Sequence, residues 1–172
     1  KGLSVAAKKS GRVAAEGLVG VNIINNQACL IEINSETDFV SRNEQFQKFV
    51  SDCSKIAVTT NGDLKNLLKS KFINSDNTVE DELTKNVATI GENLNIRRIE
   101  KINLDEPGII ISYVHNSVSE NLGKIGVILS LKSNANKNSL ENIGKKIAMH
   151  IAASNPISLN LESLDPKIID KE

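Results

Sequence analysis

The pattern that most constrains the fold is a pair of alternating apolar runs followed by a helical stripe, and it occurs twice along the chain. In the first occurrence, apolar and more polar residues alternate from Val19 to Ile23 and from Cys29 to Ile33, with Asn25-Asn26-Gln27 between the runs. This alternation predicts a β-hairpin with one buried face. Apolar residues then recur at helical spacing from Phe46 to Ala57, which predicts a helix packed on the hairpin.

The second occurrence spans roughly residues 108 to 154. The runs Ile109 to His115 and Lys124 to Leu131 predict two strands, and a helix should follow and end before Asn155-Pro156, because proline disfavours helical geometry in the preceding residue. The predicted stripe of this helix is Leu140, Ile143, Ile147 and Ile151, which aligns at a constant offset with Phe46, Phe49, Cys53 and Ala57. A repeated unit of this kind predicts two related subdomains.

The sequence therefore predicts an α+β fold of two related subdomains, each a small antiparallel sheet packed with helices. We place the boundary at Gly91, which gives an N-terminal core subdomain of residues 1–91 and a C-terminal core subdomain of residues 92–172. The strand predicted from Ile96 to Leu104 falls in the second subdomain. We predict no secondary structure for the charged tail from Ser158 to Glu172.

Four helix ends are predicted from local signals. An Ala- and Lys-rich helix from Leu3 to Glu16 should end at a C-cap at Gly17. Ser41 and Glu44 have the spacing of a capping box, and Thr78 can cap a further helix that ends at Gly91.

The charge balance argues against nucleic acid as a partner. Lys plus Arg and Asp plus Glu number 21 each, and aromatic residues make up 3% of the chain, so neither a basic surface nor a base-stacking platform is expected. No apolar run approaches the ~20 residues that span a bilayer, so we expect no membrane association. The chain begins with Lys1 rather than Met, and we expect it to be part of a longer protein.

No constellation typical of an enzyme is found. His115 and His150 are the only imidazoles, and no sequence feature pairs either one with a nucleophile or a metal ion. Cys29 and Cys53 lack CxxC spacing and a His cluster, and are more simply interpreted as small core residues. No phosphate-binding glycine loop is present. We therefore predict no catalytic residue, no metal and no cofactor.

One segment does not fit the pattern of a buried core. Asp38 and Phe39 lie in a short polar connection between the second predicted strand and the helix that follows. Phe39 can either pack beneath that helix or protrude as an aromatic anchor for a partner's pocket. The sequence alone leaves both interpretations open.

The residues around this segment carry a resemblance to a known family. Thr37-Asp38-Phe39-Val40, followed by Arg42-Asn43-Glu44-x-Phe46, resembles the signature of the elongation factor Ts family. Further similar segments follow in the family's order, and they are Ala14 to Gly17, Gly91 to Arg98, Ser112 to His115, Lys124 to Val127 and Ile147 to Ser154.

The resemblance implies a guanine-nucleotide exchange factor of translation elongation that is not an enzyme. It implies that the chain binds elongation factor Tu in its GDP-bound and nucleotide-free states. An arm of Thr37, Asp38, Phe39 and Val40 would enter near the nucleotide, with Phe39 wedged between two helices and Asp38 perturbing the magnesium and phosphate environment. The second subdomain would hold another domain of the partner, and the matching residues here are His115, Ile125, Gly126 and His150.

The same resemblance implies a bacterial cytoplasm or a bacteria-derived organelle, and it leaves open whether the chain forms a homodimer. Two other classes of function stay as alternatives. The first is a ribosome- or nucleic-acid-associated binding module without exchange activity, which a steep salt dependence of binding would reveal. The second is a small-molecule enzyme, which would need a pocket lined by titratable groups.

Overall fold

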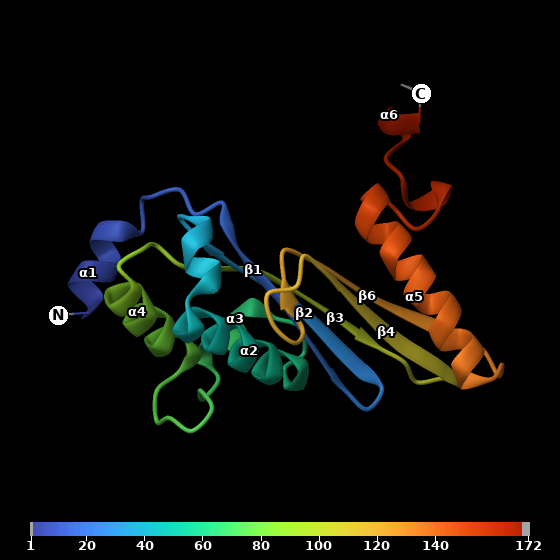
Figure 1. The fold of residues 1–172 in the computed structure, drawn as a ribbon, viewed down its shortest axis with the longest axis horizontal. Coiled ribbons are helices and arrows are strands. Elements are labelled where there is room, and N and C mark those ends of the chain that lie inside the picture. The colour runs from blue at the N-terminus through green and yellow to red at the C-terminus, as the bar shows by residue number, and fades with distance from the viewer. Residues whose placement is uncertain (1, 170–172) are drawn as a thin grey trace.

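The computed structural model describes residues 2–169, in which antiparallel sheets pack against helices (Figure 1). The predicted fold class is confirmed. The elements in chain order are α1 (Gly2–Lys9), β1 (Glu16–Ile24), β2 (Gln27–Ser35), η1 (Asp38–Arg42), α2 (Glu44–Thr59), α3 (Leu64–Lys69), α4 (Val79–Ile90), β3 (Asn95–Asn103), β4 (Gly108–His115), β5 (Leu122–Gly123), β6 (Ile125–Lys132), α5 (Lys137–Ser154), η2 (Leu161–Ser163) and α6 (Pro166–Ile169).

The first sheet has four antiparallel strands in the order β3-β2-β1-β5. Strands β1 and β2 form the predicted hairpin, with Glu16 paired to Ser35 at one end and Ile24 paired to Gln27 at the other. Asn25 in the connecting turn has a φ of 53°, a left-handed conformation that asparagine tolerates better than most residues.

The prediction that this hairpin has one buried face is wrong, because both faces are covered. Paired residues share a face, so Leu18 lies with Ile33 on the side of α2, while Val19 and Leu30 lie on the opposite side. On that opposite side Gly126 of β6 comes so close that a Cβ there would lie 2.5 Å from Leu30 Cδ1. The first sheet is therefore a central layer between helix α2 and the second sheet.

Strand β3 belongs to the first sheet and not to the second. It pairs with β2 from Asn103 opposite Gln27 to Asn95 opposite Asn34, and β5 pairs with β1 at the other edge of the sheet. The predicted placement of the strand from Ile96 to Leu104 in the second subdomain's sheet is thus wrong. The division at Gly91 stays a prediction, and strand pairing crosses it at both edges of the first sheet.

Helix α2 supplies the apolar layer beneath the first sheet. Six of its apolar side chains are at most 2% exposed, namely Phe46, Phe49, Val50, Cys53, Ala57 and Val58. The N-cap is Asn43, whose side chain accepts a hydrogen bond from the Phe46 backbone N–H at 3.0 Å. The predicted capping box of Ser41 and Glu44 is wrong, because Ser41 lies in the preceding turn η1 and its hydroxyl donates to the Asp38 carbonyl.

Helix α4 begins and ends where the sequence predicts. Thr78 and Asp81 form a reciprocal capping box at its start, and Gly91 adopts a left-handed φ of 84° at its end. A glycine here costs less than any other residue because it has no Cβ to clash.

The predicted end of the first helix is wrong. Helix α1 ends at Lys9, and Glu16 and Gly17 begin strand β1. Gly17 has a φ of 128°, and a Cβ there would lie 2.2 Å from the Ile33 carbonyl oxygen. This glycine therefore permits close approach of two strands and does not cap a helix.

The second sheet consists of β4 and β6, which pair antiparallel from Gly108 opposite Lys132 to His115 opposite Ile125. Helix α5 packs on the face of this sheet that carries Ile111 and Val127. Figure 1 shows α5 along the outer side of β4 and β6, at the end of the molecule opposite to α1.

The predicted helix α5 is confirmed, including its end at Ser154, but its predicted apolar stripe is partly wrong. Leu140, Gly144 and Ala148 are buried, whereas Ile143 is 52% and Ile147 is 37% exposed. Gly144 and Ala148 are small and allow the helix to approach the sheet closely. A pattern of large apolar side chains does not include them. The two predicted helix stripes align in the sequence, but in the structure the second stripe is not a buried face.

The end of the predicted tail contains η2 and α6, and Lys1 and residues 170–172 lie outside the described part of the chain. Among the described helices, none combines the length and the apolar character needed to cross a membrane.

Candidate functional site

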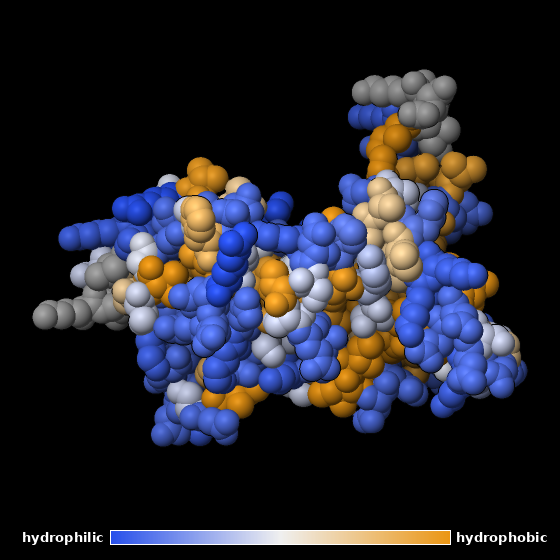
Figure 2. Space-filling model, in the orientation of Figure 1, coloured by the Kyte–Doolittle hydropathy of each residue, from blue (hydrophilic) through white to orange (hydrophobic). Residues whose placement is uncertain are grey.

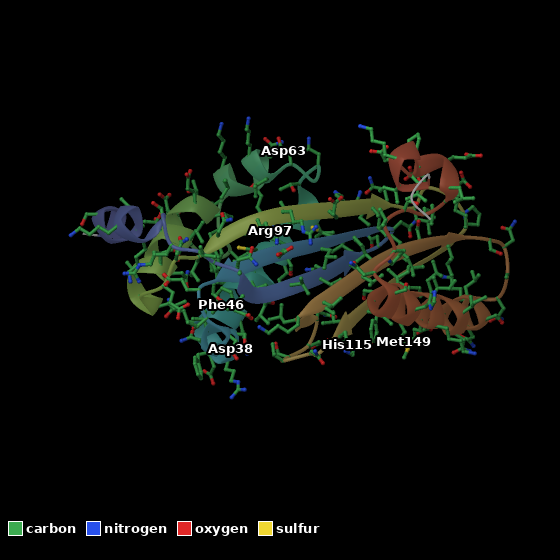
Figure 3. The ribbon with its side chains drawn as sticks, turned by 90° about the horizontal axis from the view of Figure 1, so that it is seen from above. Asp38, Phe46, Asp63, Arg97, His115 and Met149 are labelled. Atoms are coloured by element: carbon green, nitrogen blue, oxygen red, sulfur yellow. The ribbon has the colours of Figure 1, made fainter. Side chains whose placement is uncertain are left out.

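The segment between β2 and α2 forms the short 3₁₀ helix η1, which presents Phe39 to solvent. Phe39 is 76% exposed and Asp38 is exposed, while Val40 and Ser41 are buried. Figure 3 shows Asp38 at the lower edge of the molecule, outside the two sheets. The interpretation in which Phe39 packs beneath the following helix is therefore wrong, and the segment is an arm that carries an exposed aromatic ring.

The arm is attached through its second half. Val40 is 6% exposed and belongs to the main hydrophobic cluster together with Phe46 and Ile33. Because a 3₁₀ helix repeats every three residues, Phe39 and Arg42 lie on one side and both are exposed. Burial of Val40 thus orients Phe39 outward.

Hydrogen bonds to backbone carbonyls order the arm. The Ser35 hydroxyl donates to the Thr37 carbonyl at 2.9 Å, and the Ser41 hydroxyl donates to the Asp38 carbonyl at 2.5 Å. The Gln47 side-chain amide of α2 donates to the Ser41 carbonyl at 2.8 Å. The arm is therefore connected both to the end of β2 and to the first turn of α2.

The residues predicted to contact a partner from the second subdomain do not form one cluster. His115 and Ile125 are a cross-strand pair at the end of the second sheet; His115 is exposed and Ile125 is 41% exposed. The Tyr113 hydroxyl lies 3.0 Å from His115 Nδ1. Gly126 lies against the first sheet, and its lack of a side chain allows that close packing. His150 is exposed on α5, and no described hydrogen bond or ring contact joins it to His115.

Asp38 and His115 lie on the same side of the molecule, along the lower edge of Figure 3. The arm and the end of the second sheet therefore lie along one side of the molecule.

Sequence reasoning missed the exposed apolar residues outside these segments. Ile23 and Ile24 at the end of β1 are 39% and 42% exposed, and Figure 2 shows a hydrophobic patch near the free end of the β1–β2 hairpin. On α5, Ile143 and Met149 are each 52% exposed. Alternation within a strand placed Ile23 on a buried face and helical spacing placed Ile143 on one, so neither pattern identifies such exposed residues.

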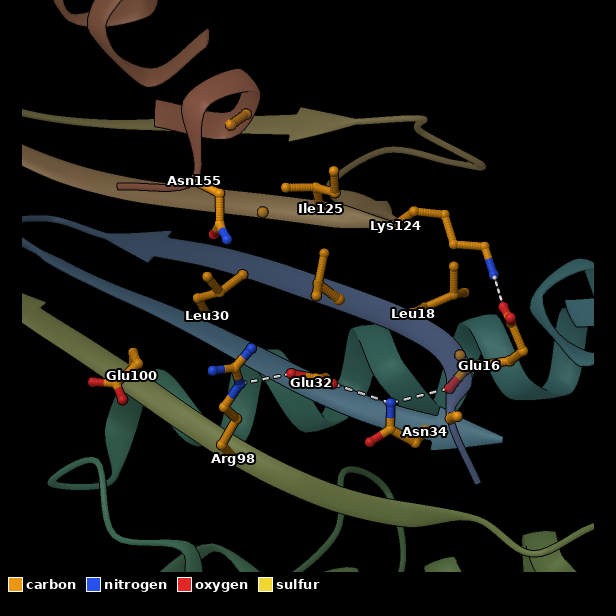
Figure 4. A pocket seen from close by; sticks show the side chains of 15 residues that line it. Glu16, Leu18, Leu30, Glu32, Asn34, Arg98, Glu100, Lys124, Ile125 and Asn155 are labelled. Carbon is orange, nitrogen blue, oxygen red and sulfur yellow. Dashed lines mark hydrogen bonds and ion pairs between the residues drawn. The ribbon is translucent and has the colours of Figure 1, made fainter. Parts of the chain in front are cut away.

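A cleft of about 590 Å³ separates the outer face of the first sheet from β6 (Figure 4). Its charged rim forms ion pairs, because Lys124 lies 3.2 Å from Glu16 and Arg98 lies 2.6 Å from Glu32. Burial alone would raise the pKa of Glu32, but hydrogen bonds from Asn34 and Arg98 and the charge of Arg98 outweigh burial and lower it. Glu32 is thus a paired carboxylate and not a poised general base.

Both cysteines are free and fully buried. Burial raises the pKa of Cys29 to about 12 and raises that of Cys53 as well, so both remain thiols at neutral pH. Within residues 2–169, no group of three or more His, Cys, Asp or Glu side chains is arranged to hold a metal ion.

Comparison with known proteins points to one family. The family model described as "Elongation factor TS" matches residues 36–172, which include the arm. Three similar proteins are named elongation factor Ts and match all 172 residues of the chain: those of Methylorubrum populi at 47% identity, Methylobacterium radiotolerans at 48% and Parvibaculum lavamentivorans at 48%. The chain spans 56% of the length of each of these relatives. With most of its residues covered by the family model, the chain belongs to the elongation factor Ts family.

Proposed function

We propose that this chain is the partner-binding part of a guanine-nucleotide exchange factor that acts on elongation factor Tu during translation elongation. The observation that carries the proposal is the exposed Phe39, which is 76% exposed on an arm whose next two residues are buried. Membership of the elongation factor Ts family supports it. In this role the protein makes and breaks no covalent bond and is not an enzyme in the usual sense.

In the proposed complex, the arm enters beside the nucleotide of elongation factor Tu. Phe39 acts as a wedge between two helices of the partner, as an aromatic anchor fills a pocket. Asp38 brings an exposed carboxylate close to the magnesium ion and the phosphates, where like charge disfavours the bound nucleotide. Thr37 and Val40 hold the two ends of the exposed pair.

Exchange then follows from linkage between two binding sites. A protein that binds the nucleotide-free partner more tightly than the GDP-bound partner must weaken GDP binding by the same factor. Reversing a two-state preference from 1:99 to 99:1 takes about 5.5 kcal/mol of differential affinity. A single aromatic hot spot supplies about 2 to 4 kcal/mol, so a second contact is required.

We assign that second contact to the end of the second sheet. His115 and Ile125 lie on the same side of the molecule as the arm, so they can grip another domain of the same partner. Gly126 allows the sheets to pack closely, and His150, which is exposed on α5, would add a separate contact. The site of action is a bacterial cytoplasm or a bacteria-derived organelle.

The test is the rate at which elongation factor Tu releases a fluorescent GDP analogue in the presence of the chain. Phe39→Ala should leave the far-UV circular dichroism unchanged, because the ring makes no core contact, and should slow release on the order of 30-fold or more, the loss expected for a hot spot worth at least 2 kcal/mol. The matched control is Leu159→Ala, which removes a side chain that is 97% exposed and far along the chain from the arm. Equal release rates for Phe39→Ala and the unaltered chain would refute the wedge.

A further inference from the structure

The base of the arm is held by a carboxylate from a segment distant in the sequence. The Thr37 backbone N–H donates to Glu92 Oε2 at 3.0 Å, and the Thr37 hydroxyl donates to Glu92 Oε1 at 2.6 Å. Both oxygens of one side chain are thus used on one residue, the residue that directly precedes the exposed Asp38. Hydrogen bonds to an ionised acceptor are shorter and stronger than those between neutral groups.

A second carboxylate connects the same two segments in the opposite direction. Glu36 Oε1 accepts a hydrogen bond from the Asn93 backbone N–H at 2.6 Å, and Glu36 Oε2 lies 3.5 Å from the Arg12 guanidinium. Glu36 is therefore hydrogen-bonded to Asn93, and its neighbour Thr37 is hydrogen-bonded to Glu92. Two crossed contacts fix both the position and the orientation of the chain where it enters the arm.

Glu92 is itself placed by rigid elements. It follows Gly91, whose left-handed conformation ends α4 and turns the chain toward the arm. The Gly91 carbonyl accepts a hydrogen bond from the Lys9 ammonium group of α1. Helix α4 is in turn fixed in the core through Val79 and Val87, which are at most 4% exposed.

We propose that Glu92 is a positioning residue that fixes the direction of the Asp38–Phe39 arm before the partner binds. The inference rests on the proposed function, since it assigns to Glu92 the task of presenting the two residues that act on the partner. An exposed arm that must be ordered during binding loses part of its interaction free energy to conformational entropy. A wedge also acts only if it enters at the correct angle, because displacement of a working group by about 1 Å can reduce a rate about 100-fold.

The variant that tests the proposal is Glu92→Ala, with Glu80→Ala as the control, since Glu80 is an exposed carboxylate at the start of the same helix α4. We expect Glu92→Ala to slow GDP release from elongation factor Tu roughly 10- to 100-fold. The control should not change it. Glu92→Gln should retain most of the rate, because its carbonyl can accept from the Thr37 N–H and its amide can donate to the Thr37 hydroxyl.

Amide hydrogen exchange separates positioning from general stability. In Glu92→Ala, protection should fall at residues 37–41 and stay unchanged in the core of α2, and the midpoint of thermal unfolding should fall only slightly. If Glu92→Ala fails to fold, Thr37→Val removes only the hydroxyl contact and should give a smaller change of the same kind. Loss of protection throughout the chain would assign Glu92 to fold stability and overturn the proposal.

The outcomes also separate this inference from the proposed function. If Phe39→Ala slows release and Glu92→Ala does not, the arm acts but Glu92 does not position it. If neither variant slows release, the exchange function fails, and unchanged protection of the arm in Glu92→Ala would then independently refute the role of Glu92.

Discussion

Gly144→Ala tests how closely α5 lies on the second sheet, because two opposing effects meet at this residue. A Cβ at Gly144 would lie 2.5 Å from Ile111 Cγ1, 3.2 Å from Ile111 Cδ1 and 3.2 Å from Leu131 Cδ1. Normal separation between carbon atoms is about 3.5 to 4.0 Å. The added methyl group would therefore be about 1 Å too close to a side chain that is 5% exposed.

The sign of the effect depends on which contribution is larger. Replacing glycine by alanine within a helix favours folding by about 1 kcal/mol. Inserting a methyl group into a packed core costs about 1 to 3 kcal/mol. We expect a cost near the upper end of that range, because Ile111 is β-branched and stiff at χ1, so its Cγ1 cannot turn away. The net effect should be a loss of about 1 to 2 kcal/mol.

The assay is unfolding followed by circular dichroism. For a chain of this length the predicted loss corresponds to a fall in the unfolding midpoint of roughly 2 to 8 °C. The control is Lys146→Ala, an exposed position of the same helix, for which the free energy of unfolding should change by less than about 0.5 kcal/mol. In an Ile111→Ala background the clash is removed, and Gly144→Ala should become stabilising. Stabilisation by Gly144→Ala in the unaltered chain would refute the close packing of helix on sheet.

Two further predictions concern titratable groups. Cys29 and Cys53 are fully buried with raised pKa values, so a thiol reagent at pH 8 should label the native chain negligibly and label two thiols per chain after unfolding in urea; fast native labelling would contradict the burial. The pKa of Glu32 is lowered by folding from its ordinary 4.5, so the unfolded chain binds a proton first as the pH falls, and stability supplied by Glu32 is present above pH 4.5 and lost below it. Glu32→Gln should make the free energy of unfolding less dependent on pH below about 4.5 in urea titrations, and an unchanged acid dependence would show that its ion pairs do not contribute.

Local signals in the sequence correctly predicted the ends of α4 and α5, where single residues determine the backbone geometry. Thr78 and Gly91 mark the two ends of α4, and the residue before Pro156 ends α5, because capping hydrogen bonds, left-handed φ and proline sterics act within a few residues. The exposure of Phe39 was one of two open interpretations, and only the burial of its neighbour Val40 decides between them.

Apart from the N-cap of α2, which is Asn43 and not Ser41, the errors arise where packing between distant segments decides the outcome. Val19 and Leu30 are covered because a second sheet lies on them, and no pattern within the hairpin records that sheet. The buried face of α5 is set by Gly144 and Ala148, which have too little apolar surface to stand out in a hydrophobic pattern. No local pattern singles out Glu92, because its contact with Thr37 joins residues 55 positions apart.

The order of strands in the first sheet has a consequence for synthesis of the chain. Strand β1 pairs at Gly20 with Leu122 of β5, roughly 100 residues later, so at a translation rate of about 5 to 20 residues per second the ribosome needs roughly 5 to 20 seconds to supply that partner. Strand β2 likewise cannot pair with β3 until that later strand has been synthesised. Until β3 has been made the nascent hairpin has two unpaired edges, and until β5 has been made it has one; such edges are templates for pairing with other chains. The non-local pairing should also slow refolding of the finished chain, because distant segments must meet before their contacts stabilise the sheet.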